Sequence, residues 1–309
     1  MKILFFCAHP DDLEFEVPSV IIAAGRDPDL ENLKVSIRKL DRAIDRSREF
    51  LLTSPSNADI KLKVACMTRG EMSSFTYITK STKKAAKIRT AELNESQNVL
   101  SGESPDYLGF FDGYVSLDEK TISTIEDYIV GLKPDIIIAP EPIYTWYHHR
   151  DHIRTGKAAF LALKRIKLNI KTGGVKMNLP SLYYFQSIWN DWYFPKYRIF
   201  KKVIDRALKA HRSQAGLLRF AKILGFFESF IHGRNVPDCF FAEALRHQAI
   251  PDQDGKLDCL KIRRLAQLSW LKRIIYYVSK RIYSMEIEDY KGRSQHLDGT
   301  IDPDFSKEW

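Results

Sequence analysis

The chain has few cysteines and no long apolar segment. Its four cysteines in 309 residues are scattered, and none forms a C-x-x-C pair, which favours a reduced, cytoplasmic setting. The longest apolar runs, such as the one around Ile136–Pro140, fall far short of the ~20 residues that a membrane-spanning helix needs. The apolar run at the N-terminus is too short for a signal peptide. We therefore expect a cytoplasmic protein.

Further absences narrow the expected function. The sequence has no internal repeat, no low-complexity tract and no G-x-S-x-G turn that would present a nucleophilic serine. What it has is 44% hydrophobic and 28% charged residues, a composition typical of a globular protein with a sizeable core. The net charge of +9 favours acidic or phosphate-bearing partners. Because this charge is dispersed and no nucleic-acid-binding module is recognisable, a nucleic-acid partner is not expected.

Strand-like and helix-like segments alternate along the chain. Short apolar runs predict strands over Lys2–Ala8, Ile60–Met67, Tyr107–Phe111, Asp135–Ala139 and Leu182–Gln186. Helical patterns occupy Val17–Ala24, Thr82–Leu100, Thr121–Leu132 and Thr155–Lys167, and Tyr197–Phe230 is helix-rich. This alternation predicts an α/β fold with a mostly parallel sheet. Sites in such folds form at the carboxyl ends of strands, where this sequence places polar residues.

Three polar groups follow predicted strands: His9-Pro10-Asp11-Asp12, Thr68-Arg69-Gly70-Glu71 and His148-His149-Arg150-Asp151-His152. The spacing of His9 and Asp12 lets both side chains reach one ion, and a ligand from a distant loop would complete a three-ligand centre with an open position. His149 and His152 have the same spacing, so one can bind the metal while the other faces a substrate. Acidic loops also cap helices and many histidines are only surface residues, but the two motifs together favour a metal site.

These motifs occur in an order that resembles the LmbE-like, or PIG-L-like, zinc-dependent N-deacetylases. The residues that carry the resemblance are Ala8–Asp12, Thr68–Glu71, Arg89-x-x-Glu92, Leu108-Gly109-Phe110-x-Asp112, Pro134-Asp135, His149-x-Asp151-His152, Lys209-x-His211-x-Ser213-Gln214 and Ala242-Glu243-Ala244. The resemblance implies a Rossmann-like three-layer fold over residues 1–246.

Two segments differ from the pattern of that family domain, one inserted within it and one following it. A charged insertion at about 27–57, with apolar residues at near-helical spacing, is longer than the family's usual link and suggests a lid or a homo-oligomer contact. Residues 247–309 are expected to form a helical, basic and aromatic C-terminal extension. The apolar periodicity of residues 259–283 predicts a helix that packs its apolar face into the core. The alternative is that this helix binds peripherally to an anionic membrane surface.

The resemblance also implies roles for individual residues. His9, Asp12 and His152 would bind Zn²⁺, although imidazole and carboxylate ligands also accept other divalent transition metals such as iron or cobalt. Asp11 would act as the general base on the water that the metal activates. His149, oriented by Asp151, would stabilise the oxyanion as a cation. The neighbouring His148 leaves the identity of that histidine open, and the spacing to His152 favours His149.

Substrate contacts are implied in the same way. Arg69 and Asp112 match positions that contact sugar hydroxyls. Tyr147 resembles a tyrosine that reaches the amide oxygen, with Tyr144 and Trp146 as competitors for that role.

The expected function is hydrolysis, by a zinc-dependent N-deacetylase, of the N-acetyl group on an N-acetylglucosamine-containing substrate, either a small molecule or a glycolipid. One alternative is a metal-dependent amidohydrolase that acts on a different acyl amide or glycoconjugate. Another is a basic nucleic-acid-binding protein with a vestigial metal site, which a steep salt dependence of DNA binding would support.

Overall fold

The computed structural model describes residues 1–24, 60–72, 80–143, 145, 147–187, 192–195, 200–215, 242–248 and 250. The insertion at 27–57 and the stretch 259–283 lie outside these residues, as does nearly all of the predicted C-terminal extension. The structure and the roles expected for these segments therefore stay predictions.

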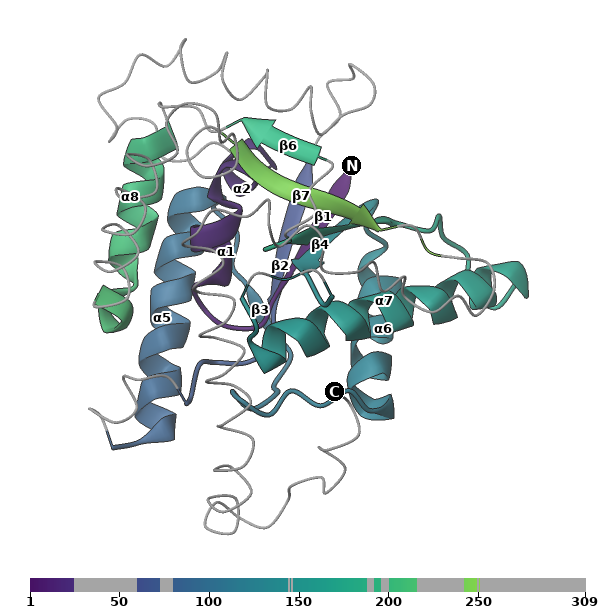
Figure 1. Ribbon diagram of the computed structural model, residues 1–309, viewed down its shortest axis with the longest axis horizontal. Helices are drawn as coiled ribbons and strands as arrows, with labels where there is room; N and C mark the ends of the chain where they lie inside the picture. The colour runs from purple at the N-terminus through teal and green to yellow at the C-terminus, as the bar shows by residue number, and fades with distance from the viewer. Residues whose placement is uncertain are drawn as a thin grey trace, which may run out of the picture.

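A seven-stranded sheet forms the centre of the molecule (Figure 1). Its strands, in chain order, are β1 (Lys2–Cys7), β2 (Lys61–Cys66), β3 (Asp106–Tyr107), β4 (Ile136–Pro140), β5 (Ser181–Phe185), β6 (Trp192–Pro195) and β7 (Ala242–Gln248). Across the sheet the order is β3-β2-β1-β4-β5-β7-β6. The first five strands in this order are parallel, whereas β7 runs antiparallel to β5 and to β6.

The central strand β1 contributes to two separate cores because its side chains alternate between the faces of the sheet. Ile3 and Phe5 belong to one cluster of buried side chains and Leu4 and Phe6 to the other, and all four are fully buried. An apolar run without polar alternation is typical of a parallel strand that is covered on both faces. This is why the sequence of β1 reads as continuously hydrophobic.

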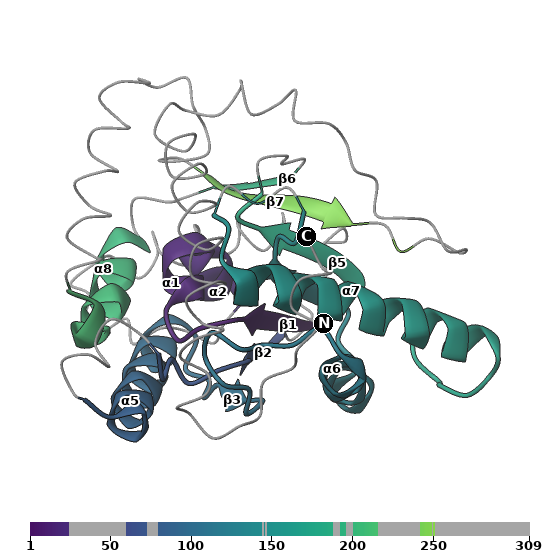
Figure 2. The same ribbon diagram turned by 60° about the horizontal axis from the view of Figure 1, so that its bottom comes forward.

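Helices cover both faces of the sheet (Figure 2). The first core cluster contains residues of α1 (Asp12–Glu16), α2 (Pro18–Ala24), α5 (Thr82–Leu100) and α8 (Lys201–Ala210). The second contains residues of α6 (Glu119–Leu132) and α7 (Arg150–Lys171). A short 3₁₀ turn, η3 (Arg212–Gln214), follows α8. Among the described helices, none combines the length and the apolar character that crossing a membrane requires.

The predicted α/β fold with a mostly parallel sheet is confirmed, and several boundaries differ. Helix α7 begins at Arg150, five residues before the predicted start, because His149 caps it with a side-chain nitrogen. Strand β3 is only two residues long, although the backbone N–H groups of Leu108 and Phe110 still donate to the carbonyls of Cys66 and Met67. The sequence patterns predicted neither helix α1 nor strands β6 and β7.

The strand order creates a switch point between β1 and β4. From β1 the chain proceeds to β2 and β3 on one side of the sheet, and then returns to β4 on the other side. The chain connections that follow β1 and β4 therefore lead to opposite sides of the sheet, and open α/β sheets bind ligands at the carboxyl ends of strands at such a switch point. His9 follows β1 and His149 follows β4, so both predicted histidine motifs meet there.

Candidate metal centre

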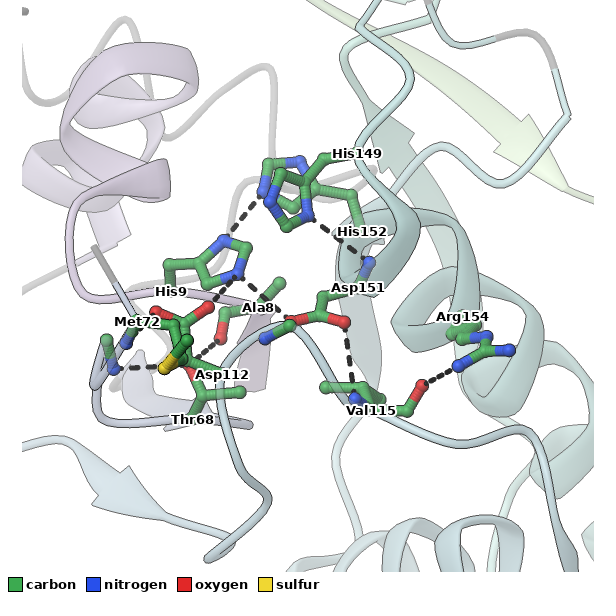
Figure 3. Close-up of polar contacts among 12 residues, drawn as sticks. Ala8, His9, Thr68, Met72, Asp112, Val115, His149, Asp151, His152 and Arg154 are labelled. Atoms are coloured by element: carbon green, nitrogen blue, oxygen red, sulfur yellow. Dashed lines mark hydrogen bonds and ion pairs between the residues drawn. The ribbon is translucent and has the colours of Figure 1, made fainter. Parts of the chain in front are cut away.

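A polar residue follows the carboxyl end of each of the five parallel strands, so these residues lie along one edge of the sheet. His9 follows β1, Thr68 follows β2, Asp112 lies after β3, His149 comes after β4 and Gln186 follows β5. Figure 3 shows the rings of His9, His149 and His152 facing one another, with Asp112 and Asp151 beside His9.

The loop after β1 is shaped by Asp12. Its Oδ2 atom accepts hydrogen bonds from the backbone N–H groups of Ala8 and His9, each at 2.9 Å. This clamp directs Oδ1 toward the imidazoles, 3.2 Å from Nε2 of His152 and 3.6 Å from Nδ1 of His9. The two imidazole nitrogens are themselves 3.0 Å apart. The three residues predicted as metal ligands thus converge, each with one ligand atom.

The outer contacts of His9 determine which of its nitrogens is protonated. Nε2 lies 3.1 Å from Oδ1 of Asp112 and 3.2 Å from Oδ2 of Asp151. Because ionised carboxylates only accept hydrogen bonds, Nε2 carries the proton and the neutral ring keeps its lone pair on Nδ1. Burial lowers the pKa of His9, but Asp112, Asp12 and Asp151 outweigh this effect and hold the pKa well above its ordinary value. The same carboxylates favour a metal cation.

In His152 the proton is on the other ring nitrogen, Nδ1, than in His9. Its Nδ1 atom is 2.8 Å from Oε1 of Gln186, an acceptor, so Nδ1 carries the proton and Nε2 keeps the lone pair. Once His9 is neutral, its Nδ1 and Nε2 of His152 direct their lone pairs at the same position, 3.0 Å apart and beside a carboxylate oxygen. In the protonated His9 ring a proton occupies that position, and a metal cation would take its place. Tetrahedral zinc with nitrogen and oxygen ligands at 2.0–2.1 Å separates its ligand atoms by about 3.3 Å, so the donor set fits a metal of that kind.

His149 lies close to the same centre. One group of potential metal ligands in the described residues comprises His9, His149 and His152, and a second comprises His9, Asp112 and Asp151. Nδ1 of His149 accepts from the backbone N–H of Asp151 at 3.3 Å, which leaves the proton on Nε2. Burial, followed by His9 and His152, lowers the pKa of His149 well below its ordinary value. In the metal-free protein this environment favours the neutral ring, and the catalytic cation that the family resemblance implies stays a prediction.

Asp151 contacts His149 through its backbone, and its fully buried carboxylate serves other partners. Oδ2 accepts from Nε2 of His9 and from the N–H of Gly113 at 2.7 Å, and Oδ1 accepts from the N–H of Val115 at 3.2 Å. The carboxylate thereby connects the start of α7 to the loop after β3 and to His9.

Asp11, the predicted base, is paired with a buried arginine. Nη2 of Arg89 on α5 lies 2.8 Å from Oδ1 of Asp11. Arg89 passes under Gly70, where a Cβ would lie 2.5 Å from Nη1 and 2.7 Å from Cδ of Arg89. Gly70 also has a φ of +70°, which favours glycine. The glycine of the second motif thus makes room for the side chain that holds Asp11.

The remaining predicted contacts surround this centre. Arg69 is exposed. Asp112 is buried, and its Oδ2 atom accepts from the N–H of Met72 at 3.0 Å while Oδ1 contacts His9. The ring of Tyr147 packs against His149 and His152, with ring centroids 6.1 Å and 5.7 Å away. Tyr144 and Trp146, the competitors for its role, lie outside the described residues.

Two residues at the centre were missed by sequence reasoning. Gln186 contacts His152 directly, and Glu16 on α1 contacts Gln186. Gln186 follows a predicted strand, so the expectation that sites form at strand ends could have found it. No motif signals Glu16. His148 belongs to neither potential ligand group of the described chain.

A family model described as PIG-L, GlcNAc-PI de-N-acetylase, matches residues 50–163. This range contains the motifs at Thr68–Glu71 and His149–His152. The resemblance to the PIG-L, or LmbE-like, family is confirmed. No curated protein matches the sequence.

Solved structures of low sequence identity share the fold. The N,N'-diacetylchitobiose deacetylase of Pyrococcus horikoshii has 18% identity and a TM-score of 0.57, over 80% of this chain and 83% of that one. The 4-carboxy-2-hydroxymuconate hydratase GalB of Pseudomonas putida has 15% identity and a TM-score of 0.54, over 82% and 99%. A conserved protein of Thermus thermophilus has 18% identity and a TM-score of 0.53, over 81% and 95%. Because one of these proteins is named a hydratase, the reaction must be argued from the site.

Proposed function

We propose that this chain is a metal-dependent deacetylase that removes the N-acetyl group from an N-acetylglucosamine-containing substrate. The observation that carries the proposal is the convergence of Nδ1 of His9, Oδ1 of Asp12 and Nε2 of His152 at the switch point of the sheet. Three protein ligands are typical of a catalytic zinc centre, which keeps a further position open. The PIG-L family match supports both the reaction and the substrate class.

Amide hydrolysis needs a nucleophile, a polarised carbonyl and a proton for the leaving amine. Zinc bound by His9, Asp12 and His152 would supply a nucleophilic water near neutral pH and Lewis-acid polarisation of the carbonyl. Asp11 is adjacent to a ligand in sequence and is held by Arg89. We assign to it the transfer of a proton from the attacking water to the departing nitrogen.

His149 is assigned to the oxyanion. Because Nδ1 accepts from the backbone, the proton is on Nε2, and we assign this N–H as the donor to the oxyanion. The histidine ring is adjacent to both His9 and His152, with centroid separations of 4.4 Å and 5.0 Å. A neutral donor placed where negative charge develops still stabilises the transition state, because the site is buried and preorganised.

Substrate recognition is assigned to Arg69, which is exposed, and to Tyr147, which is half-buried beside His149 and His152. Arg69 and Tyr147 keep their predicted roles as contacts to the sugar and to the amide oxygen. Asp112 is assigned first to orienting His9, since its two carboxylate oxygens already accept from His9 and Met72. The same catalytic groups would serve a different acyl amide, so only a substrate comparison separates these alternatives.

The test is acetate release from a panel of N-acetylglucosamine conjugates. The panel contains the free sugar, diacetylchitobiose, and inositol-linked and lipid-linked forms, each assayed with metal-stripped enzyme before and after zinc is added. Zinc-dependent release is expected, and the preferred conjugate distinguishes a soluble substrate from a glycolipid. Absence of acetate from every conjugate, with zinc bound, would overturn the proposed substrate class.

A further inference from the structure

Gln186 adopts a backbone conformation that ordinarily favours glycine. Its φ is +64°, directly after β5 ends at Phe185, and the residue is buried. A non-glycine residue in the left-handed region costs roughly 1–2 kcal/mol, so its side chain must be held by favourable contacts. Such outliers cluster at functional sites. Here the side chain lies between a metal-ligand candidate and an acidic residue of α1.

The two contacts of the Gln186 side-chain amide fix its orientation. Its Nε2 atom donates to Oε1 of Glu16 at 3.2 Å, and its Oε1 atom faces Nδ1 of His152 at 2.8 Å. A carboxylate offers only acceptors, whereas an amide offers one oxygen acceptor and one NH₂ donor. Glu16 therefore selects the orientation in which the amide oxygen points to His152. In the reversed orientation two oxygens would face each other.

This orientation determines whether Nε2 of His152, which faces the metal centre, carries a lone pair or a proton. An amide oxygen as the neighbour requires a proton on Nδ1, which leaves Nε2 free to coordinate. With the NH₂ group as the neighbour, Nδ1 would have to accept, and the proton would move to Nε2. His9 differs because two carboxylates contact its Nε2 directly. His152 instead depends on an amide that can rotate.

We infer that Glu16 and Gln186 are positioning residues that hold His152 in the tautomer able to bind the metal. The inference rests on the metal centre of the proposed function and assigns neither residue to the reacting atoms. Outer partners of metal-binding histidines commonly contribute 10- to 100-fold to metal affinity, roughly the size of effect expected here.

Three variants test the inference. Gln186→Leu removes the acceptor for His152, and Glu16→Gln removes the carboxylate that orients the amide. The double variant Glu16→Gln with Gln186→Glu exchanges the two groups, so that a donor again faces an acceptor and a carboxylate oxygen faces Nδ1 of His152. Glu95→Gln is the matched control, because Glu95 is an exposed carboxylate on α5 that pairs with Arg212.

Two measurements are made on the full chain. The zinc dissociation constant is obtained by competition with a chromophoric chelator, and the His152 tautomer of the metal-free protein is read from its ¹⁵N–¹H correlation spectrum. We expect about 10- to 100-fold weaker zinc binding in Gln186→Leu, a smaller loss in Glu16→Gln, and recovery in the double variant. The spectrum should show only the Nδ1-protonated tautomer in the wild type and in the double variant, and a mixture of tautomers in the two single variants.

Unchanged zinc affinity and an unchanged tautomer in Glu16→Gln and Gln186→Leu would overturn the inference. If Gln186→Leu does not fold, the comparison of Glu16→Gln with the double variant decides alone, since recovery requires the pairing. A wild-type protein that binds zinc but releases no acetate would count against the proposed reaction. The zinc dissociation constants and the His152 tautomer would still test the inference. The two failures are therefore distinguishable.

Discussion

At the scale of single residues, the centre works by fixing protons and lone pairs. The Oδ2 atom of Asp12 is occupied by backbone N–H groups, so that Oδ1 faces the imidazoles. The two histidines that we propose as metal ligands have opposite nitrogens engaged by acceptors, which directs Nδ1 of His9 and Nε2 of His152 toward the proposed ion. Motif spacing predicted that His9 and Asp12 could share an ion, and the family resemblance added His152; this ligand set stays a prediction. Neither the spacing nor the resemblance could identify Gln186, whose role comes from a contact between residues 34 positions apart.

Replacing Asp11 with asparagine tests its role as the base. Asparagine keeps the shape of the side chain but cannot accept the proton, so we expect kcat to fall about 10²- to 10⁴-fold while zinc content is retained. Acetate release and bound zinc are measured on the same preparation. Asp205→Asn, a half-buried carboxylate on α8 that pairs with Lys201, is the control. Wild-type kcat in Asp11→Asn would remove Asp11 from the mechanism.

Gly70→Ala should disturb Asp11 through Arg89. The new Cβ would lie 2.5 Å from Nη1 of Arg89, which is buried and paired with Asp11. We expect a loss of stability of about 1–2 kcal/mol from the positive φ, together with a fall in kcat. Gly102→Ala is the matched control, because Gly102 has a φ of +73° and open space around its Cβ position. If both variants lose the same stability and keep full kcat, the Arg89 contact does not support catalysis.

At the scale of elements, helix α7 and strand β4 must approach closely to place His152 beside His9. Gly156 permits this approach, since a Cβ there would lie 2.1 Å from the carbonyl oxygen of Pro140. The sequence predicted this helix and this strand from apolar periodicity. It missed the first turn of α7, because the polar residues His149 and Asp151 form the cap and the first turn there. Strand β7 was missed because Ala242-Glu243-Ala244 carries no strong strand pattern.

Gly156→Ala should therefore push α7 away from β4. Overpacking of this kind costs about 1–3 kcal/mol of stability, and the displaced His152 should weaken zinc binding. Gly131→Ala on α6 is the control, because its Cβ meets nothing within 4 Å and alanine favours the helix by up to about 1 kcal/mol. Thermal unfolding and zinc titration measure both effects. A Gly156→Ala protein as stable as the control would show that the approach is not tight.

A second contact between elements predicts a pH dependence. Nε2 of His211, between α8 and η3, lies 3.7 Å from Oε1 of Glu14 on α1, and both side chains are fully buried. Burial lowers the pKa of His211, but Glu14 outweighs this effect and raises it above its ordinary value. A raised histidine pKa stabilises the fold below its unfolded value of about 6.5, and this contribution disappears as the pH rises through the folded pKa.

The variant His211→Gln should thus lose more stability at pH 6 than at pH 9. Burial raises the pKa of Glu14, but His211 outweighs this effect and the pKa lies below its ordinary value. The carboxylate therefore contributes to stability above its unfolded pKa, and this contribution is lost as the pH falls through the lowered pKa of the folded state. The difference between the variant and the wild type should be largest between about pH 4.5 and 6.5. Urea unfolding across this range measures it. A difference independent of pH would contradict the ion pair.

At the scale of the whole molecule, the strand order brings distant motifs together. Predicting an α/β fold from alternating patterns was sufficient to place polar residues at one edge of the sheet. The order β3-β2-β1-β4-β5 adds the switch point between β1 and β4, where residues 143 positions apart meet. Patterns along the chain do not reveal strand order, which is decided by how the helices pack on the two faces. The same architecture occurs in a deacetylase and in a hydratase, so the reaction follows from the residues at the edge.

The most direct test of the account is a titration of zinc into metal-stripped protein with the preferred conjugate, recording bound zinc and acetate release together. We expect acetate release to rise in proportion to bound zinc and to level off at one ion per chain. We expect none of this activity in His152→Leu, which lacks one of the three converging ligand atoms. Full acetate release from metal-free protein, or none with one zinc bound per chain, would contradict the account.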